Sequence, residues 1–135
     1  MNAKDELELL RRHKSVINRI SAERSELEDV LYKCTSRLDG MPKGNNGDRM
    51  GSLVARVTEL QDDLAAELGE YLRVRDLLKA KIALLQDERF RNLLTFRYVA
   101  LKNTWKNVAD CMGYDERYVY KLHDGALAEY ERLNN

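Results

Sequence analysis

The sequence has few residues that would end a helix and few that would cross-link the chain. Proline occurs once in the 135 residues, at Pro42, and tryptophan once, at Trp105. The two cysteines, Cys34 and Cys111, are too few for a disulfide framework and lie far apart, so neither belongs to a zinc ligand pair. We therefore expect reduced thiols. Many charged residues and few helix breakers favour long, solvated helices over a sheet protein.

The chain also lacks an excess of charge of either sign, because 23 Lys and Arg balance 23 Asp and Glu. A uniformly basic surface is excluded, and any attraction to a polyanion must be local. No apolar run reaches the roughly 18 residues of a membrane span, and the acidic N-terminus lacks the apolar segment of a secretory signal. We expect a cytoplasmic protein that makes no membrane contact.

Loop-forming residues are concentrated in one segment, residues 40–51. It holds Pro42 and four of the seven glycines, a composition typical of a loop. The segment lacks the Gly-Lys-Ser/Thr ending of a phosphate-binding P-loop, and it follows a helical pattern rather than a strand. We predict a flexible connection between two helices.

Apolar residues on both sides of this loop recur at alternating spacings of three and four, the heptad pattern of packed helices. Seven of the nine positions in each stripe are apolar. The positions are Leu10, His13, Ile17, Ile20, Arg24, Leu27, Leu31, Cys34 and Leu38, and then Val57, Gln61, Leu64, Leu68, Tyr71, Arg75, Leu78, Ile82 and Leu85. Equal stripe lengths of about 42 Å predict an antiparallel helical hairpin over residues 1–86, with Leu38 near Val57 and Leu10 near Leu85.

The apolar face of the second helix is wider than one partner helix would cover. Leu60, Leu72, Val74 and Leu77 extend it beyond the heptad stripe. A face of this width usually packs against a third element or a second subunit. We therefore expect a homodimer through the hairpin.

From residue 87 onward the pattern changes to short helices. Apolar residues between Leu93 and Leu101 predict the first, and Thr104 is a suitable N-cap for a second, Trp105–Met112. Gly113 can adopt the positive φ of a tight turn, and Asp115 can cap a third helix. The buried stripe of that helix is predicted at Val119, Leu122, Ala126, Tyr130 and Leu133.

The spacing from Trp105 onward agrees with a helix-turn-helix. Ala109 stands where the two helices would cross closely, and Gly113 stands in the turn. The inward positions are filled by Val108, Met112, Tyr114, Val119 and Leu122. The alternative is a three-helix bundle with a tight turn and no ligand. We predict an all-α fold, a long antiparallel hairpin over residues 1–86 followed by a helix-turn-helix DNA-binding domain over residues 87–135.

Local charge supports a DNA-binding module. Seven basic and three acidic residues lie between Arg89 and Lys121, a balance of +4 that leaves −4 on the rest of the chain. The N-terminal part of the second helix of a helix-turn-helix enters the major groove, so we predict base contacts from Glu116, Arg117, Tyr120 and Lys121. Contacts with the DNA backbone are predicted for Lys102, Thr104, Lys106 and Asn107. Tyr118 flanks this face and suits packing as well as contact.

The stretch 104–122, closing on Ala126 and Leu127, resembles region 4 of bacterial sigma factors, the helix-turn-helix that recognises the −35 promoter element. With the loop at 39–44 and the segment 94–98, the whole chain is similar to the sigma-like, ArpU/RinA-type late transcription regulators of Gram-positive phages. The resemblance implies DNA reading by the same four residues, although Glu116 and Tyr120 stand where sigma factors commonly carry Arg. The chain has no counterpart of the regions that bind the −10 element. The resemblance therefore implies an activator or adaptor beside RNA polymerase.

The leading hypothesis is a sequence-specific transcription regulator that binds double-stranded DNA and acts with RNA polymerase. A second is a phage DNA-packaging or assembly factor that carries a helix-turn-helix and forms ring-sized oligomers. A third is an adaptor whose helix-turn-helix binds a sigma factor or polymerase rather than DNA. An enzyme is the weakest option, because His13 lies in the predicted seam and His123 has no Ser or Cys partner at a recognisable spacing. No metal-ligand spacing occurs, and we expect no metal and no cofactor.

Overall fold

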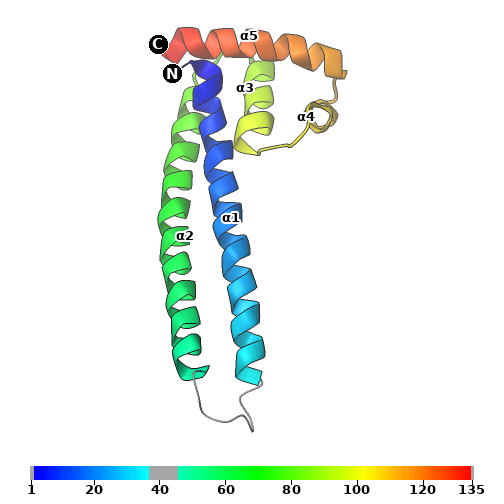
Figure 1. Ribbon diagram of the computed structural model, residues 1–135. Helices are drawn as coiled ribbons and strands as arrows, with labels where there is room; N and C mark the ends of the chain where they lie inside the picture. Colours follow the sequence, from blue (N-terminus) through cyan, green and yellow to red (C-terminus); the bar gives the residue numbers. More distant parts are fainter. Residues whose placement is uncertain (1, 37–45, 135) are drawn as a thin grey trace. The chain divides into compact units, whose positions relative to one another are not determined.

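The structure, a computed structural model, describes residues 2–36 and 46–134. These residues form helices joined by short connections, with no strand among them, which confirms the predicted all-α class. Figure 1 shows the elements in chain order: α1 (Ala3–Ser36), α2 (Asn46–Ile82), α3 (Glu88–Leu94), the π-helical turn η1 (Thr95–Val99), α4 (Trp105–Met112) and α5 (Glu116–Asn134). Within the described ranges, no helix has the apolar length needed to cross a membrane.

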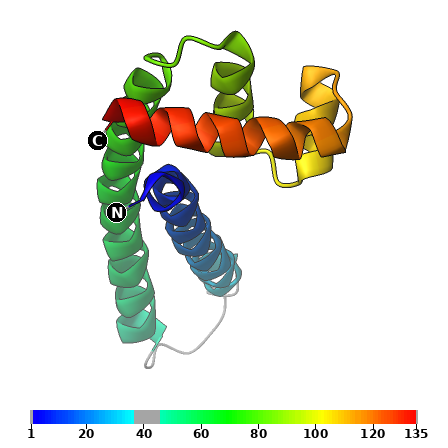
Figure 2. The same ribbon diagram turned by 90° about the horizontal axis from the view of Figure 1, so that it is seen from above.

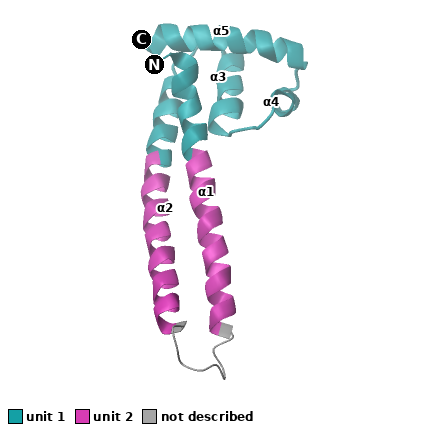
Figure 3. Cartoon of the chain, viewed as in Figure 1, with its two compact units in different colours: residues 1–13, 71–135 teal, residues 14–70 magenta. Residues whose placement is uncertain are grey.

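The chain forms two compact units, which divide both long helices (Figure 3). Unit 1 comprises residues 1–13 and 71–135, and unit 2 comprises residues 14–70. This division differs from the boundary after residue 86 that the sequence predicted. The N-terminal end of α1 and the C-terminal end of α2 belong to unit 1. Their side chains Leu7, Leu10 and Leu78 are buried in the same hydrophobic cluster as side chains of α3, α4 and α5.

Unit 2 consists of the α1 segment 14–36 and the α2 segment 46–70, which run antiparallel (Figure 3). Ile17 and Ile20 of α1 are buried, as are Val57 and Leu60 of α2. Nη2 of Arg56 lies 3.0 Å from Oε1 of Glu23, so an exposed ion pair also joins the two segments. Leu38, which the stripe pattern places near Val57, lies outside the described residues.

The N-terminal end of α2 differs from its prediction. The loop predicted at residues 40–51 was too long at its C-terminal end, because the helix already begins at Asn46. Gly47 and Gly51 therefore lie within the helix. Asp48 in the first turn complements the partial positive charge at the helix N-terminus, which favours this earlier start.

The inward face of α2 also differs from the predicted stripe. Gln61 and Leu68 are exposed, whereas Leu60 and Val74 are buried. Heptad spacing allows either order of three and four residues, and the two registers share every second position. Burial of Leu60 in place of Gln61, and of Val74 in place of Arg75, favours the observed register. Of the residues predicted to widen this face, Leu72 and Leu77 remain exposed.

Unit 1 is built around one hydrophobic core. Figures 1 and 2 show α3 against the middle of α5, and α4 beside the N-terminal end of α5. The fully buried large side chains of this core are Leu7, Leu10, Leu78, Leu85, Leu93, Leu94, Tyr98, Val108, Val119 and Tyr130. Burial of each such side chain stabilises the fold by roughly 1.5–3 kcal/mol, so this core fixes the orientation of α4 and α5 within unit 1.

The first short helix ends earlier than predicted. α3 is capped by Asp87, whose Oδ1 accepts a hydrogen bond from the backbone N–H of Arg89 at 2.9 Å. It continues into η1, which ends at Val99, and Leu101 has a positive φ of 56°. The Arg97 side chain donates to the carbonyl oxygens of residues 102 and 103 at 3.2 and 3.1 Å. These hydrogen bonds stabilise the connection between η1 and α4.

Candidate nucleic-acid interface

α4 begins and ends where the sequence predicts. The Thr104 side chain accepts a hydrogen bond from the backbone N–H of Asn107 at 3.1 Å, which satisfies one donor of the first helical turn. Gly113 ends the helix in the left-handed conformation at φ 72°. Thr104, predicted to contact a DNA phosphate, thus has a capping role, while Asn107 is exposed.

α5 presents its apolar side to α3 and α4. Four of the five residues predicted in its buried stripe are buried, and Leu133 is half-buried. Gly125 lies against the ring of Phe90, where a Cβ atom at position 125 would stand 2.9 Å from Cζ. The missing side chain of Gly125 therefore allows α5 to approach α3 closely, and the helix continues past it to Asn134.

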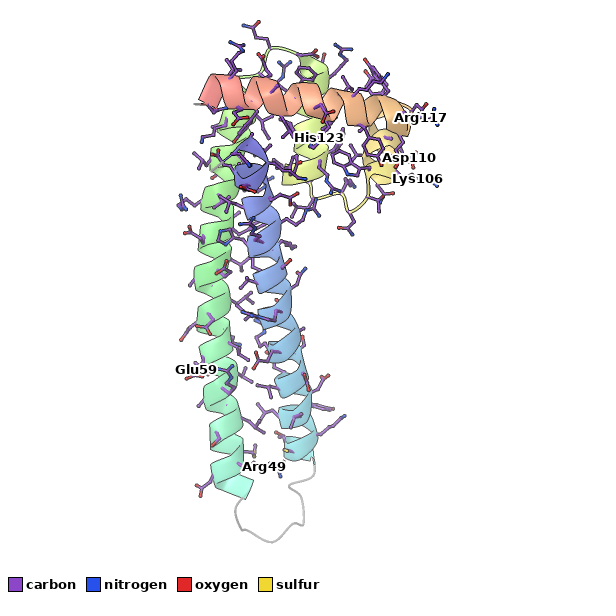
Figure 4. The ribbon with its side chains drawn as sticks, turned by 45° about the horizontal axis from the view of Figure 1, so that its top comes forward. Arg49, Glu59, Lys106, Asp110, Arg117 and His123 are labelled. Carbon is purple, nitrogen blue, oxygen red and sulfur yellow. The ribbon has the colours of Figure 1, made fainter. Side chains whose placement is uncertain are left out.

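Four basic residues at the α4 end of unit 1 form no ion pair with another described residue. Lys102, Lys106, Arg117 and Lys121 are all exposed. Among residues 2–36 and 46–134, no side chain pairs with any of the four by a hydrogen bond or an ion pair. Figure 4 shows Lys106 and Arg117 at the same end of α5. This end of the module therefore carries positive charge that is available to an external anion.

The three other basic residues of the module are engaged internally. Arg89 forms an ion pair with Asp87, with Nη2 2.9 Å from Oδ2. Arg91 donates to the backbone carbonyl oxygens of Leu85 and Gln86. Arg97 holds the connection before α4, and its guanidinium carbon lies 4.4 Å from the centroid of the Trp105 ring. The local net charge does not distinguish these three bonded cations from the other four.

Two of the four predicted base-contacting residues bind each other. The Tyr120 hydroxyl donates a 2.8 Å hydrogen bond to Oε1 of Glu116, and this bond raises the pKa of Tyr120. The Tyr120 ring also meets the edge of Trp105 at a centroid distance of 5.7 Å. Glu116 is half-buried rather than fully outward. Arg117 and Lys121 therefore project freely, whereas Glu116 and Tyr120 form a local pair on α5.

The sequence did not predict that His123 is buried. Its Nε2 lies 2.6 Å from the Tyr98 hydroxyl, and its ring meets Trp105 at 4.5 Å between centroids. Burial lowers the pKa of His123 to about 4 and raises the pKa of Tyr98 to about 12. The spacing from Val119 could have revealed this, because residues four apart share a helix face. Through these contacts His123 of α5 packs against both η1 and α4.

A tyrosine pair lies beside the exposed cations of α5. Tyr114, predicted to face inward, is exposed because it follows the left-handed turn at Gly113. Its ring meets that of Tyr118 edge-on at a centroid distance of 5.0 Å. The Tyr118 hydroxyl accepts a hydrogen bond from Nη1 of Arg89. The sequence leaves Tyr118 open to either packing or contact, and it predicts no contact for Arg89.

Comparison with protein-family models, with curated proteins and with solved structures gives no match to this chain. Across the part of the chain that the structure describes, no three His, Cys, Asp or Glu side chains gather to hold a metal ion. The functional conclusion therefore rests on the residues of α4, α5 and the connections that flank α4.

Proposed function

We propose that the chain is a sequence-specific DNA-binding transcription regulator in which α4, the Gly113 turn and α5 act as a helix-turn-helix. The observation that carries the proposal is the group of four exposed cations near the start of α4 and α5 that form no ion pair with any other described residue. The resemblance of residues 104–122 to sigma factor region 4 supports the same assignment.

In this proposal the N-terminal half of α5 enters the major groove. Arg117 is long enough to form a two-pronged hydrogen bond with a guanine edge, and Lys121, one turn later, can reach a guanine or a phosphate. Lys102 and Lys106 flank the N-terminus of α4 and contact the phosphate backbone. The Glu116–Tyr120 pair lies on the same helix, and opening it would free the carboxylate to accept from a cytosine amino group.

The proposal includes a homodimer and an action beside RNA polymerase, as the resemblance to phage late regulators implies. Four free cations per chain give a modest attraction to DNA, so joining two modules would raise the affinity. Leu72 and Leu77 of unit 1 support association through α2, because both remain exposed, by 52% and 42%.

Two substitutions test the DNA-binding proposal. Arg117→Ala and Lys121→Ala should each weaken binding to a promoter duplex from the adjacent genomic DNA without lowering the melting temperature, because neither side chain is part of the core. Arg132→Ala, which removes an exposed cation near the far end of α5, is the matched control. Unchanged DNA affinity in both test variants would contradict the proposal. Retention of a polymerase subunit without salt-sensitive DNA binding would instead favour the adaptor hypothesis.

Light scattering tests the second part of the proposal. A dimer is expected, because two modules suffice to bind paired half-sites. A ring-sized oligomer would favour the DNA-packaging hypothesis.

A further inference from the structure

We infer that the DNA-binding surface extends from Arg117 and Lys121 across Tyr118 to Arg89 of α3, and that Arg89 and Tyr118 bind a backbone phosphate at one rim of the groove. This inference rests on the proposed DNA-binding function. It assigns a ligand to Arg89 and Tyr118, neither of which is among the predicted DNA contacts.

Arg89 lies beside the exposed face of α5. Its guanidinium is hydrogen-bonded to the Tyr118 hydroxyl, although 29 residues separate the two in the chain. Tyr118 follows Arg117 directly and lies three residues before Lys121, so all three lie on adjoining strips of the helix surface. The Arg89 side chain, 48% exposed, therefore adds a third cation next to the two free ones of α5.

Arg89 and Tyr118 retain hydrogen-bond donors for an external ligand. An arginine has five N–H donors in a fixed plane. Nε and Nη2 of Arg89 each donate to Asp87, and Nη1 donates to Tyr118, so two N–H groups remain for an external acceptor. Because the Tyr118 oxygen accepts from Arg89, its own proton is free to be donated. Three donors aimed from neighbouring atoms suit a phosphate group.

The two sides of α5 differ in what they contact. Position 118 lies roughly 160–200° around the helix from positions 116 and 120, at about 100° per residue. Glu116 and Tyr120 therefore lie on the side of α5 that packs on Trp105, and Tyr118 lies on the opposite side, with Arg117 and Lys121 between them. A phosphate backbone that meets Arg117 and Lys121 can therefore extend toward Tyr118, where Arg89 adds a further cation.

Asp87 opposes phosphate binding and also provides the sharpest test. Its carboxylate caps α3 and holds the Arg89 side chain in place, but it offsets the charge of Arg89. Asparagine caps helices about as well as aspartate. Asp87→Asn therefore removes the opposing charge while the cap is retained.

The experiment is a salt titration of fluorescence anisotropy with a random-sequence duplex, which reports phosphate contacts independently of any operator. Arg89→Gln should weaken binding by about tenfold and reduce the slope of log K against log salt by about 0.9, the value for one phosphate. Tyr118→Phe should weaken binding less, because only a neutral donor is lost. Arg132→Gln is the control for loss of one exposed charge.

Asp87→Asn should change binding in the opposite direction, giving tighter binding and a steeper salt dependence. If Asp87→Asn and Arg89→Gln both weaken binding, the pair only supports the fold and the inference is overturned. The inference is also overturned if the wild-type chain binds DNA, Arg117→Ala weakens that binding, and Arg89→Gln behaves like Arg132→Gln. Absence of wild-type binding at low salt would instead overturn the proposed function itself.

Discussion

The hydroxyl of Tyr130 donates a 2.6 Å hydrogen bond to Oε1 of Glu6, 124 residues away in the chain. The same carboxylate oxygen accepts from Nζ of Lys81 at 2.6 Å, so one group joins α1, α2 and α5 within unit 1. Burial by itself would raise the pKa of Glu6, but the hydrogen bonds from Lys81 and Tyr130 outweigh it and lower that pKa. The orientation of α5 in unit 1 thus depends on a charged group as well as on the core.

Replacing Tyr130 by Phe should therefore destabilise the protein. The substitution keeps the buried ring and removes a hydrogen bond to a carboxylate, which costs roughly 1.5–3 kcal/mol. Urea unfolding followed by circular dichroism measures this change. Tyr32→Phe is the matched control, because Tyr32 is 75% exposed. Equal stabilities for the two variants would contradict the role of the Glu6 contact.

The buried His123 predicts a loss of stability in mild acid. Below pH 6.5 the histidine of the unfolded chain takes up a proton, whereas the folded chain resists protonation until about pH 4. The unfolded state then binds more protons, so the free energy of unfolding falls as the pH falls through this window. Glu6 adds a similar loss only below its ordinary pKa of 4.5.

Measurement of unfolding free energy between pH 7 and pH 4.5 tests this account. His123→Gln, which has no titrating group, should flatten the profile whatever its effect at pH 7. His13→Gln is the matched single-histidine variant, because His13 lies on a different helix, α1. A His123→Gln profile as steep as that of the wild type would contradict the assignment of the pH dependence to His123.

Gly69 of α2 and Gly125 of α5 should respond differently to replacement by alanine. Gly69→Ala should stabilise by about 0.5–1 kcal/mol, because no atom would meet the new Cβ and alanine favours a helix. Gly125→Ala should lose this gain, since its Cβ would meet the Phe90 ring. The melting temperatures of both variants, and of Gly125→Ala combined with Phe90→Leu, provide the test. Independent effects of the Phe90 and Gly125 substitutions would contradict the predicted contact.

The cap of α4 gives a further prediction. Thr104→Ala should destabilise by about 1 kcal/mol, because the N–H of Asn107 loses its acceptor, while Thr104→Ser should retain the wild-type stability. Thermal unfolding of the two variants measures the difference. A destabilisation of the same size in both would show that the hydroxyl cap is unimportant.

Local signals predicted the local elements of this chain. Thr104 and Gly113 set the limits of α4, because a side-chain acceptor and a positive φ are each required at a single position. The buried stripe of α5 followed from residues three and four apart. The register of α2 could not be chosen from spacing, because Leu60 and Gln61 both fit a heptad. Only the packed helices show that Leu60 is the buried residue.

The partners of polar side chains required the folded chain. Arg89 and Tyr118, like Glu6 and Tyr130, are distant in sequence, and no periodicity joins them. The same holds for the difference between free and engaged cations. The sequence predicts a basic module, but only the folded chain shows that Arg117 and Lys121 are free while Arg91 and Arg97 bind backbone carbonyl oxygens.

The most direct test of the DNA-binding proposal is fluorescence anisotropy of the wild-type chain with a labelled promoter duplex from the adjacent genomic DNA, titrated from low to physiological salt. The proposal predicts binding whose log K falls linearly with log salt, with a slope equivalent to several phosphate contacts per chain, and tighter binding to the promoter than to a random duplex. Absence of binding to either duplex at low salt would contradict it.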